Sequence, residues 1–178
     1  MEQKLEAYRR KRNFLKTSEP SGKEEKPVGV TKRKIFAVQL HYARTTHFDF
    51  RLEWDGVLLS WAVPKGPSFN PKDKRLAVRV EEHPLDYADF EGVIPKGEYG
   101  GGTVLLWDKG YWTETEDFAR GLEKGSLKLR LDGKRLKGGW ALVRLNDKDK
   151  AEDEKENWLL FKEKDSFAKD TSGLTGRE

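Results

Sequence analysis

Short runs of alternating or wholly apolar residues, broken by turn-forming residues, follow one another along the chain from residue 34 onward. In the clearest run, residues 47–52, polar and apolar side chains alternate strictly. Successive side chains of a β-strand point to opposite faces, so this run predicts a strand with one polar and one apolar face. The candidate strands are Ile35–Tyr42, His47–Trp54, Val57–Val63, Leu76–Glu82, Gly102–Trp107, Tyr111–Glu114, Ser126–Leu131, Trp140–Leu145 and Trp158–Lys162. Asp55-Gly56 and Asp132-Gly133 predict tight hairpins. So many short strands, with little helix between them, predict an antiparallel β-barrel or sandwich.

Two segments have the composition of short helices. Leu5–Phe14 is rich in helix-forming residues near the start of the chain. Thr115–Lys124 is the candidate helix of the body, with Thr115 as its expected N-cap and Gly125 as the residue that ends it. The fold class that we predict is therefore mainly β, with a short N-terminal helix and one small helix in the body.

Charge is distributed unevenly. Residues 1–34 contain 11 Lys/Arg and 5 Asp/Glu, a surplus of +6, whereas the remaining 24 basic and 26 acidic residues sum to −2. A basic arm on a near-neutral body suits a polyanionic partner, and a solvated tail is the alternative. We predict an arm over residues 1–34 (a helix and a connector) that docks on a barrel domain, 35–168, followed by a flexible tail, 169–178.

Composition excludes several classes of protein. The chain has no cysteine, so disulfides, thiolate catalysis and cysteine-ligated zinc are impossible. No apolar stretch approaches the ~20 residues of a membrane span, and the charged N-terminus is not a signal peptide. We expect a cytoplasmic, soluble monomer that has no membrane partner.

The polar face of residues 47–52 predicts a metal site. His47, Asp49 and Arg51 share this face at intervals of about 6.6 Å, and His41 precedes them by a turn-length segment. Two imidazoles and a carboxylate suit Zn, Mn, Co or Fe better than Ca or Mg, and three protein ligands leave positions open for substrate. Arg51 beside them would face an anion. The alternative is a pair of surface or core-edge histidines with an ordinary strand carboxylate.

Other polar residues are weaker candidates. Gln39 shares the parity of His41, and Lys65 stands at a strand end where it would hold a phosphate or simply be solvated. The strand parity places Arg79, Glu81 and His83 on one face of their strand. His83 and Tyr87 are candidates for proton donation or phosphate contact. The glycine-rich segment 95–103 is interpreted as a tight corner where backbones approach closely rather than as a phosphate cradle.

Two long phrases carry a resemblance to a known family: FAVQLHYARTTHFDFRLEWDGVLLSWAVPKGPS and KRLAVRVEEHPLDYADFEGVIPKGEYGGGTV. They resemble the 3′-phosphoesterase domain of the bacterial and archaeal ATP-dependent DNA ligase D system, which also occurs as a stand-alone protein. The resemblance extends from LEAYRRKRNF to NWLLFKEKDSFA. It implies a compact antiparallel β-barrel with its active site in a solvated hollow on one side. It also implies manganese-dependent trimming of 3′ ends, in which a terminal ribonucleoside is removed and the remaining 3′-phosphate is hydrolysed to a 3′-hydroxyl.

The resemblance also implies roles for individual residues. The implied metal ligands are His41, His47 and Asp49. The residues implied to grip the scissile phosphate are Arg51, His83 and Tyr87. The residues implied to lie nearby are Arg12, Glu19, Gln39, Ser60, Lys65, Arg75 and Glu81 or Glu82. Where the family commonly has Arg-Asp-Phe, this chain has Arg12-Asn13-Phe14, which puts ribonucleoside removal in more doubt than phosphate removal.

The implied cofactor is Mn²⁺, with Zn²⁺ or Co²⁺ as alternatives. The implied partners are DNA or DNA/RNA 3′ ends in a duplex primer-template, and a separate DNA ligase, polymerase or Ku. Two other functions compete with this one. A cupin-like metal enzyme acting on a small metabolite predicts a closed, apolar, neutral pocket. A non-catalytic nucleic-acid-binding module leaves the pattern of His41, His47 and Asp49 unexplained.

Overall fold

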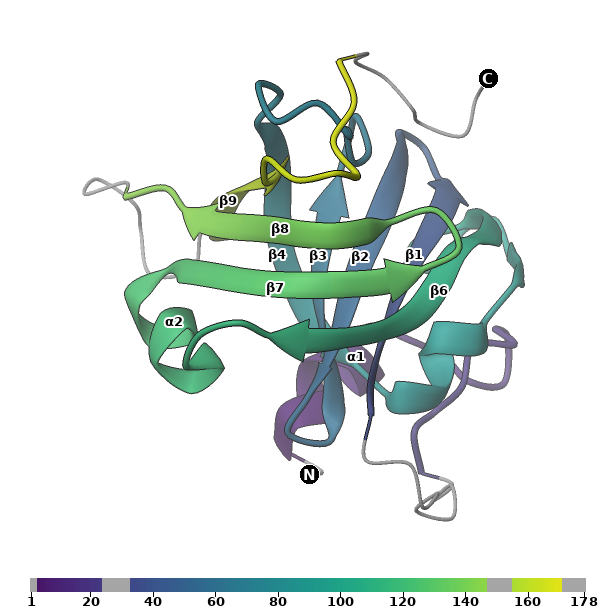
Figure 1. Cartoon of the computed structure of the whole chain (residues 1–178). Helices are drawn as coiled ribbons and strands as arrows, with labels where there is room; N and C mark the ends of the chain where they lie inside the picture. The colour runs from purple at the N-terminus through teal and green to yellow at the C-terminus, as the bar shows by residue number, and fades with distance from the viewer. Residues whose placement is uncertain (1–2, 24–32, 147–154, 171–178) are drawn as a thin grey trace.

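The structure is a computed structural model that describes residues 3–23, 33–146 and 155–170. Its strands are β1 (Lys34–Tyr42), β2 (Thr46–Trp54), β3 (Val57–Val63), β4 (Arg75–His83), β5 (Gly92–Ile94), β6 (Gly102–Glu114), β7 (Ser126–Gly133), β8 (Lys137–Arg144) and β9 (Asn157–Lys162). Antiparallel pairing in the order β1-β2-β3-β4-β9-β8-β7-β6, with β1 also paired to β6, closes an eight-stranded barrel (Figure 1). The predicted fold class is confirmed, and closure leaves β5 as an addition to the start of β6.

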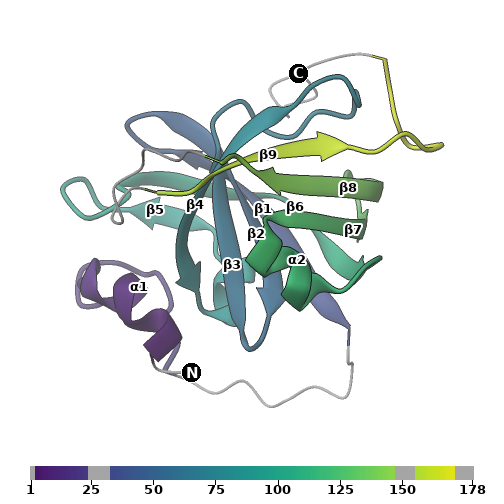
Figure 2. The same ribbon diagram turned by 90° about the vertical axis from the view of Figure 1, so that its left-hand side faces the viewer.

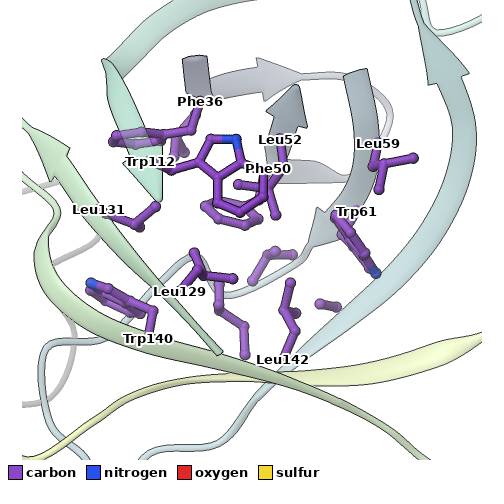
Figure 3. Packing of buried hydrophobic residues seen from close by; sticks show 14 of the residues in the cluster. Phe36, Phe50, Leu52, Leu59, Trp61, Trp112, Leu129, Leu131, Trp140 and Leu142 are labelled. Carbon is purple, nitrogen blue, oxygen red and sulfur yellow. The ribbon is translucent and has the colours of Figure 1, made fainter. Parts of the chain in front are cut away.

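The barrel interior is filled by the apolar faces of its strands. Phe48, Phe50 and Leu52, the apolar residues of the alternating run, are each at most 1% exposed. Trp61 and Trp140 pack in the same cluster from β3 and β8 (Figure 3). Burying each such side chain contributes about 1.5–3 kcal/mol. This packing leaves the polar face of β2 on the outer wall of the barrel, where the small-metabolite alternative had required an enclosed apolar pocket.

The two predicted hairpins have different outcomes. Asp55 (φ 52°) and Gly56 (φ 84°) form the two-residue turn between β2 and β3, as predicted. The second turn lies two residues farther along the chain than predicted. Strand β7 continues through Gly133, whose N–H donates to the carbonyl of Leu136 (2.9 Å). The buried carboxylate of Asp108 accepts the backbone N–H groups of residues 134–136 (2.9, 3.2 and 2.7 Å) and so fixes the turn there.

Strand β6 differs more from the sequence-based prediction than any other predicted strand. The sequence predicts two strands separated by Asp108-Lys109-Gly110, which has the composition of a turn, but β6 runs through all three residues. Asp108 is only 3% exposed because its carboxylate is hydrogen-bonded to the turn after β7. The pairing of β1 with β6 skips Trp107, which makes a bulge. Strand β5 and the 3₁₀ helix η2 (Leu85–Asp89) were not predicted from the sequence.

The helices are shorter than predicted. A 3₁₀ turn, η1 (Gln3–Leu5), leads into α1 (Glu6–Arg10), and α2 spans Phe118–Lys124. Asp117, not Thr115, is the N-cap of α2, because its side chain accepts the N–H of Arg120 (3.2 Å) while the N–H of Thr115 still bonds to β7. Gly125 ends α2 in the left-handed conformation, as predicted. None of the helices in the described segments is long and apolar enough to cross a bilayer.

A second apolar cluster lies outside the barrel wall. Its buried members are Tyr8, Ala37, Leu58, Tyr87, Ala88, Phe90, Ile94 and Val104. Tyr8 is wholly buried there, so α1 packs on the outer face of the barrel (Figure 2). The described part of the arm thus covers the same wall that carries the polar face of β2. The division into arm, barrel and tail remains a prediction, because residues 24–32, 147–154 and 171–178 lie outside the described segments.

Candidate metal and phosphate site on the outer barrel wall

The three predicted metal ligands lie together at one end of the β1–β2 hairpin. His41 and His47 are direct partners in the pairing, and Asp49 follows on the same face. The carboxylate oxygens of Asp49 lie 3.2 Å from Nε2 of His47 and 3.5 Å from Nδ1 of His41. One ligand atom from each residue lies within 4.8 Å of the others, so the group could hold an ion. Two ligands about 2.1 Å from a tetrahedral ion are about 3.4 Å apart, which matches these separations.

Backbone carbonyls orient both imidazoles. Nε2 of His41 lies 2.6 Å from the carbonyl oxygen of Gly100, and Nδ1 of His47 lies 3.0 Å from that of Thr45. A carbonyl oxygen only accepts hydrogen bonds, so these two nitrogens carry hydrogens. The opposite nitrogens therefore face Asp49, where they donate to the carboxylate when protonated and offer lone pairs to a metal when not. Metal-ligating histidines are typically held in this way by a second hydrogen bond.

The charges around Asp49 favour its ionised form. Burial alone would raise the pKa of Asp49, but the positive charge of Arg51 and hydrogen bonds from both histidines hold it far below its usual value. Burial alone would likewise lower the pKa of His47, but the hydrogen bond and charge of Asp49 outweigh it and raise that pKa. In the absence of a metal, this carboxylate thus favours a proton on His47.

Arg51 lies beside the ligand group and is itself 3% exposed. Its Nε donates to Oε1 of Gln39 (2.7 Å) and its Nη1 to Oγ of Ser60 (2.8 Å). Its Nη2 is 3.6 Å from Asp49, and its guanidinium carbon lies 4.7 Å from the ring centroid of Tyr87. Gln39 is fixed in turn by donating to two backbone carbonyls, those of residues 87 and 90 (2.8 and 2.9 Å). Gln39 and Ser60 thus hold the arginine in one orientation.

A β-bulge brings His83 to this face and separates it from Arg79, with which strand parity grouped it and which pairs with the buried Trp61. Between the β4 partners of Leu58 and Ser60 lie two residues, where β3 has one, so His83 changes face. Its Nδ1 donates to the carbonyl of Glu81 (2.8 Å) and leaves Nε2 facing the site. Burial, followed by the charges of Arg51 and Arg12, lowers the pKa of His83 well below its usual value. His83 is therefore neutral at pH 7.

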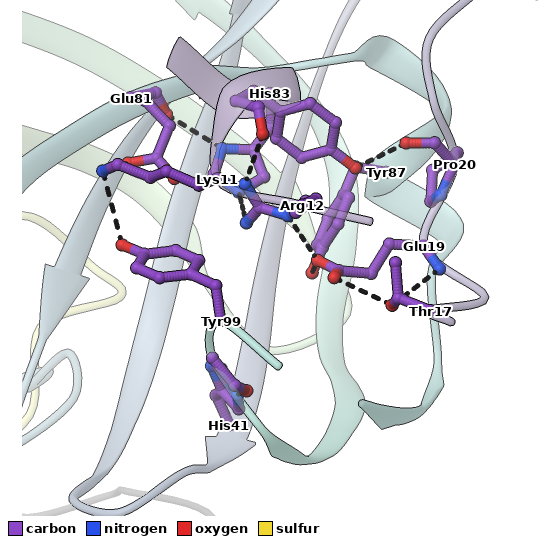
Figure 4. A network of polar contacts seen from close by, with 12 residues as sticks. Lys11, Arg12, Thr17, Glu19, Pro20, His41, Glu81, His83, Tyr87 and Tyr99 are labelled. Atoms are coloured by element: carbon purple, nitrogen blue, oxygen red, sulfur yellow. Dashed lines mark hydrogen bonds and ion pairs between the residues drawn. The ribbon is translucent and has the colours of Figure 1, made fainter. Parts of the chain in front are cut away.

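The arm adds a second buried arginine to the site (Figure 4). Nε of Arg12 lies 2.9 Å from a carboxylate oxygen of Glu19, Nη1 is 3.3 Å from Glu81, and Nη2 is 3.4 Å from Nε2 of His83. Tyr87 donates to the same oxygen of Glu19 (2.7 Å). Burial raises the pKa of Tyr87 far above its usual value, so its hydroxyl stays protonated. Of the two glutamates left open by the sequence, Glu81 belongs to this network.

Other predicted residues lie apart from this network. Glu82 pairs with Arg79 (3.3 Å). Arg75 donates to the carbonyl of Lys65 (3.1 Å), and both line a cavity of about 590 Å³ whose lining includes none of the other predicted site residues among those described. Asn13 is exposed, and its side chain accepts the N–H two residues on (3.0 Å) in a local turn.

Sequence reasoning missed the contribution of the glycine-rich loop. It is a tight corner, as predicted, since a Cβ on Gly102 would lie 2.0 Å from the carbonyl oxygen of Tyr42. Its Gly100 carbonyl also fixes His41, and Tyr99 meets the arm at Lys11, whose Nζ lies 3.5 Å from the phenol oxygen. A tyrosine among glycines was the only sequence signal for the contact with Lys11. The contact of the Gly100 carbonyl with His41 involves the backbone, so no side chain could signal it.

Comparisons with known proteins identify a family and several relatives of this chain. The family described as the DNA ligase D 3′-phosphoesterase domain matches residues 39–144. The multifunctional non-homologous end joining protein LigD of Pseudomonas aeruginosa is 52% identical over 93% of this chain and 19% of that protein. The LigD proteins of Mycobacterium tuberculosis and Mycolicibacterium smegmatis are 46% and 41% identical over 80% and 91% of this chain, respectively, and 18% and 21% of those proteins. The chain thus spans about a fifth of the length of these relatives.

Proposed function

This chain belongs to the DNA ligase D 3′-phosphoesterase domain family, and from that premise we propose that it is a manganese-dependent phosphoesterase that heals 3′ ends in DNA repair. It removes a 3′-phosphate, and a 3′-terminal ribonucleoside where one is present, from primer-template ends to leave a 3′-hydroxyl for ligation. The observation that carries the proposal is the convergence of His41, His47 and Asp49 beside the buried guanidinium of Arg51.

The donor set fits a divalent transition metal. Nδ1 of His41, Nε2 of His47 and the carboxylate of Asp49 would hold the ion, and the hydrogen bonds to backbone carbonyls leave those nitrogens free to bind. Mn²⁺ is proposed from the family, and Zn²⁺ or Co²⁺ would suit the same ligands. When bound, such an ion supplies Lewis-acid charge to a phosphate oxygen.

The chain's own residues would then stabilise the charge that develops on the phosphate and protonate the leaving oxygen. Arg51 and Arg12 place two guanidinium groups around one phosphate and neutralise the charge that develops on its oxygens. His83 is neutral in the free protein because of burial and these two arginines. A bound phosphate anion opposes that effect and raises the pKa of His83, so Nε2 can carry a proton to the leaving oxygen. Tyr87 orients the pair of Arg12 and Glu19 by donating to the carboxylate.

We further propose that Lys65 and Arg75 contact the nucleic acid farther along the strand, since they line a basic cavity beside the same barrel end. The partners in this proposal are DNA or DNA/RNA 3′ ends, with a ligase, polymerase or Ku as separate chains. The protein is proposed to act as a cytoplasmic monomer.

A primer-template assay tests the function. Recessed primers ending in a 3′-phosphate or in a ribonucleotide are incubated with Mn²⁺, Mg²⁺ or EDTA, beside the variant His41→Ala. Conversion to a 3′-hydroxyl that requires Mn²⁺ and disappears in the variant is expected. Phosphate release without ribonucleoside removal would assign the missing activity to Asn13. The variant Asn13→Asp should then restore ribonucleoside removal. Metal binding with no conversion of either end would refute the proposal.

A further inference from the structure

Tyr99 is a large aromatic side chain that the fold leaves 42% exposed at the rim of the candidate site. It lies in the glycine-rich loop between β5 and β6, and Figure 4 shows its ring between His41 and the arm residues Lys11 and Arg12. The metal and phosphate chemistry proposed above makes no use of this ring. Tyrosine is enriched at binding interfaces, because its ring is apolar and its hydroxyl is polar.

Backbone and side-chain contacts fix the ring relative to the metal ligands. The residue after Tyr99 is Gly100, whose carbonyl accepts from Nε2 of His41 (2.6 Å). On the other side, Nζ of Lys11 lies 5.0 Å from the ring centroid, and the guanidinium carbon of Arg12 lies 5.2 Å from it. Tyr99 is therefore one residue from a carbonyl that orients a predicted ligand, with two cations against its ring.

The loop that presents the ring is held by backbone hydrogen bonds within the loop itself. The N–H of Glu98 donates to the carbonyl of Pro95 (3.1 Å), and the N–H of Gly101 donates to that of Glu98 (3.0 Å). Gly97 (φ 95°) and Gly100 (φ 74°) adopt backbone conformations that residues with a Cβ rarely take. A preformed platform loses little conformational entropy when a ligand stacks on it.

We propose that Tyr99 is a stacking platform for the terminal base of a nucleic-acid 3′ end. This inference rests on the proposed function, which places the 3′-phosphate beside the metal ligands and Arg51. The terminal base is then one sugar away from that phosphate. Every nucleobase has a π-face, so the platform would accept any of the four bases. Lys11 and Arg12 beside the ring complement the charge of the backbone. Tyr99 would thus select a nucleotide end over a simple phosphate ester.

A pair of substrates isolates the stacking contribution. One primer ends in a natural nucleotide with a 3′-phosphate, and the other ends in an abasic residue with the same phosphate. For Tyr99→Leu, the KM of the first substrate should rise about tenfold with kcat unchanged, while the KM of the abasic substrate should not change. Tyr99→Phe and Tyr99→Trp keep an aromatic ring and should match the wild type, although Tyr99→Phe loses the contact of Lys11 with the hydroxyl.

Tyr111 provides the matched control. It is 36% exposed, with the guanidinium carbon of Arg33 4.3 Å from its ring centroid, but it pairs with Ile35 at the other end of β1. Six residues along β1 place it about 20 Å from His41. Tyr111→Leu should leave both KM values unchanged.

Two results would overturn the inference: an equal rise in KM for both substrates, which would make the ring a support for the arm, and no rise for either. Failure of the proposed function would look different, since the wild type would release no phosphate. In that case a primer ending in 2-aminopurine still tests stacking. Quenching of its fluorescence by the wild type, lost in Tyr99→Leu, supports the platform, and quenching that is equal in both proteins or absent from both refutes it.

Discussion

At the scale of single residues, the ligand group is an anion surrounded by cations and ring nitrogens. Asp49 is buried and ionised, and its oxygens face Nε2 of His47, Nδ1 of His41 and Nη2 of Arg51. Removing the carboxylate leaves two imidazoles and a buried guanidinium with no negative charge among them. Such a site attracts a divalent cation far less strongly, so Asp49 should matter most for metal affinity.

Asp49→Ala should therefore lose most of its Mn²⁺ affinity while remaining folded. Calorimetric titration with Mn²⁺ measures the affinity, and circular dichroism reports the fold. His83→Ala is the matched control, because this residue lies on the same wall but contacts no predicted ligand in the described network. It should bind Mn²⁺ as the wild type does. Unchanged affinity in Asp49→Ala would show that this residue is not a ligand.

The sequence predicted these residues because strand parity is a local property. Alternation placed His47, Asp49 and Arg51 on one face, and the hairpin pairing then brought in His41. The carbonyl of Gly100, which orients His41, comes from 59 residues away and has no side chain to signal it. Side-chain chemistry was thus predictable, whereas the backbone groups that orient it were not.

At the scale of elements, the N-terminal arm completes the site. Tyr8 anchors α1 on the outer wall, and Arg12 then reaches His83, Glu19 and Glu81. Arg10 and Lys16 of the same segment are exposed. Cations placed beside a phosphate site in this way would contact the nucleic-acid backbone outside the active centre.

Replacing Arg10 and Lys16 together by glutamine should weaken primer-template binding at low salt and make its salt dependence shallower. Loss of two phosphate contacts lowers the slope of log K against log salt by about 2 for a duplex. Fluorescence anisotropy at several salt concentrations gives the slope. Arg120 and Lys128 are also exposed, on α2 and β7, and their double glutamine variant should keep the wild-type slope. A wild-type slope in the arm variant would exclude the arm from the interface.

The bulge in β4 shows where element-level prediction stops. A strict period of two placed His83 on the same face as Arg79, and one extra residue between Val80 and His83 separates the two. Bulges depend on the partner strand, so the sequence of β4 alone carries no clear sign of one. The turn after β7 is similar, because the carboxylate that fixes it lies on β6.

At the scale of the whole molecule, the barrel is a rigid wall and the site is built on its outside. The sequence predicted short antiparallel strands, but closure through β1 and β6 depends on contacts between distant segments. The apolar face of β2 fills the interior, so its polar face is directed toward the arm. This arrangement buries titratable groups between the two layers and links their charge to stability.

Acid should destabilise the metal-free protein through His83. Below its ordinary pKa of 6.5 the unfolded chain binds a proton there, whereas the folded protein does not until the pH reaches the lowered value. The unfolded state then binds more protons, so the free energy of unfolding falls as the pH falls, by up to about 1.4 kcal/mol per pH unit. The raised pKa of His47 affects stability only above pH 6.5, and the lowered pKa of Asp49 only below about 3.8.

Urea unfolding in EDTA between pH 6.5 and 5 measures this decline. The wild type should lose stability over this interval, His83→Gln should lose much less, and His47→Gln should follow the wild type. Equal declines in the wild type and His83→Gln would mean that His83 is not held neutral in the folded state.

We propose that one ion and one phosphate bind side by side on the outer barrel wall. The most direct measurement is the structure of crystals grown with Mn²⁺ and a non-hydrolysable 3′-phosphate analogue, with anomalous diffraction recorded at the manganese edge. We expect one anomalous peak bounded by Nδ1 of His41, Nε2 of His47 and the carboxylate of Asp49, with the phosphate between the ion and Arg51. A manganese peak elsewhere, or a phosphate bound away from Arg51, would show that the ion and the phosphate do not share this site.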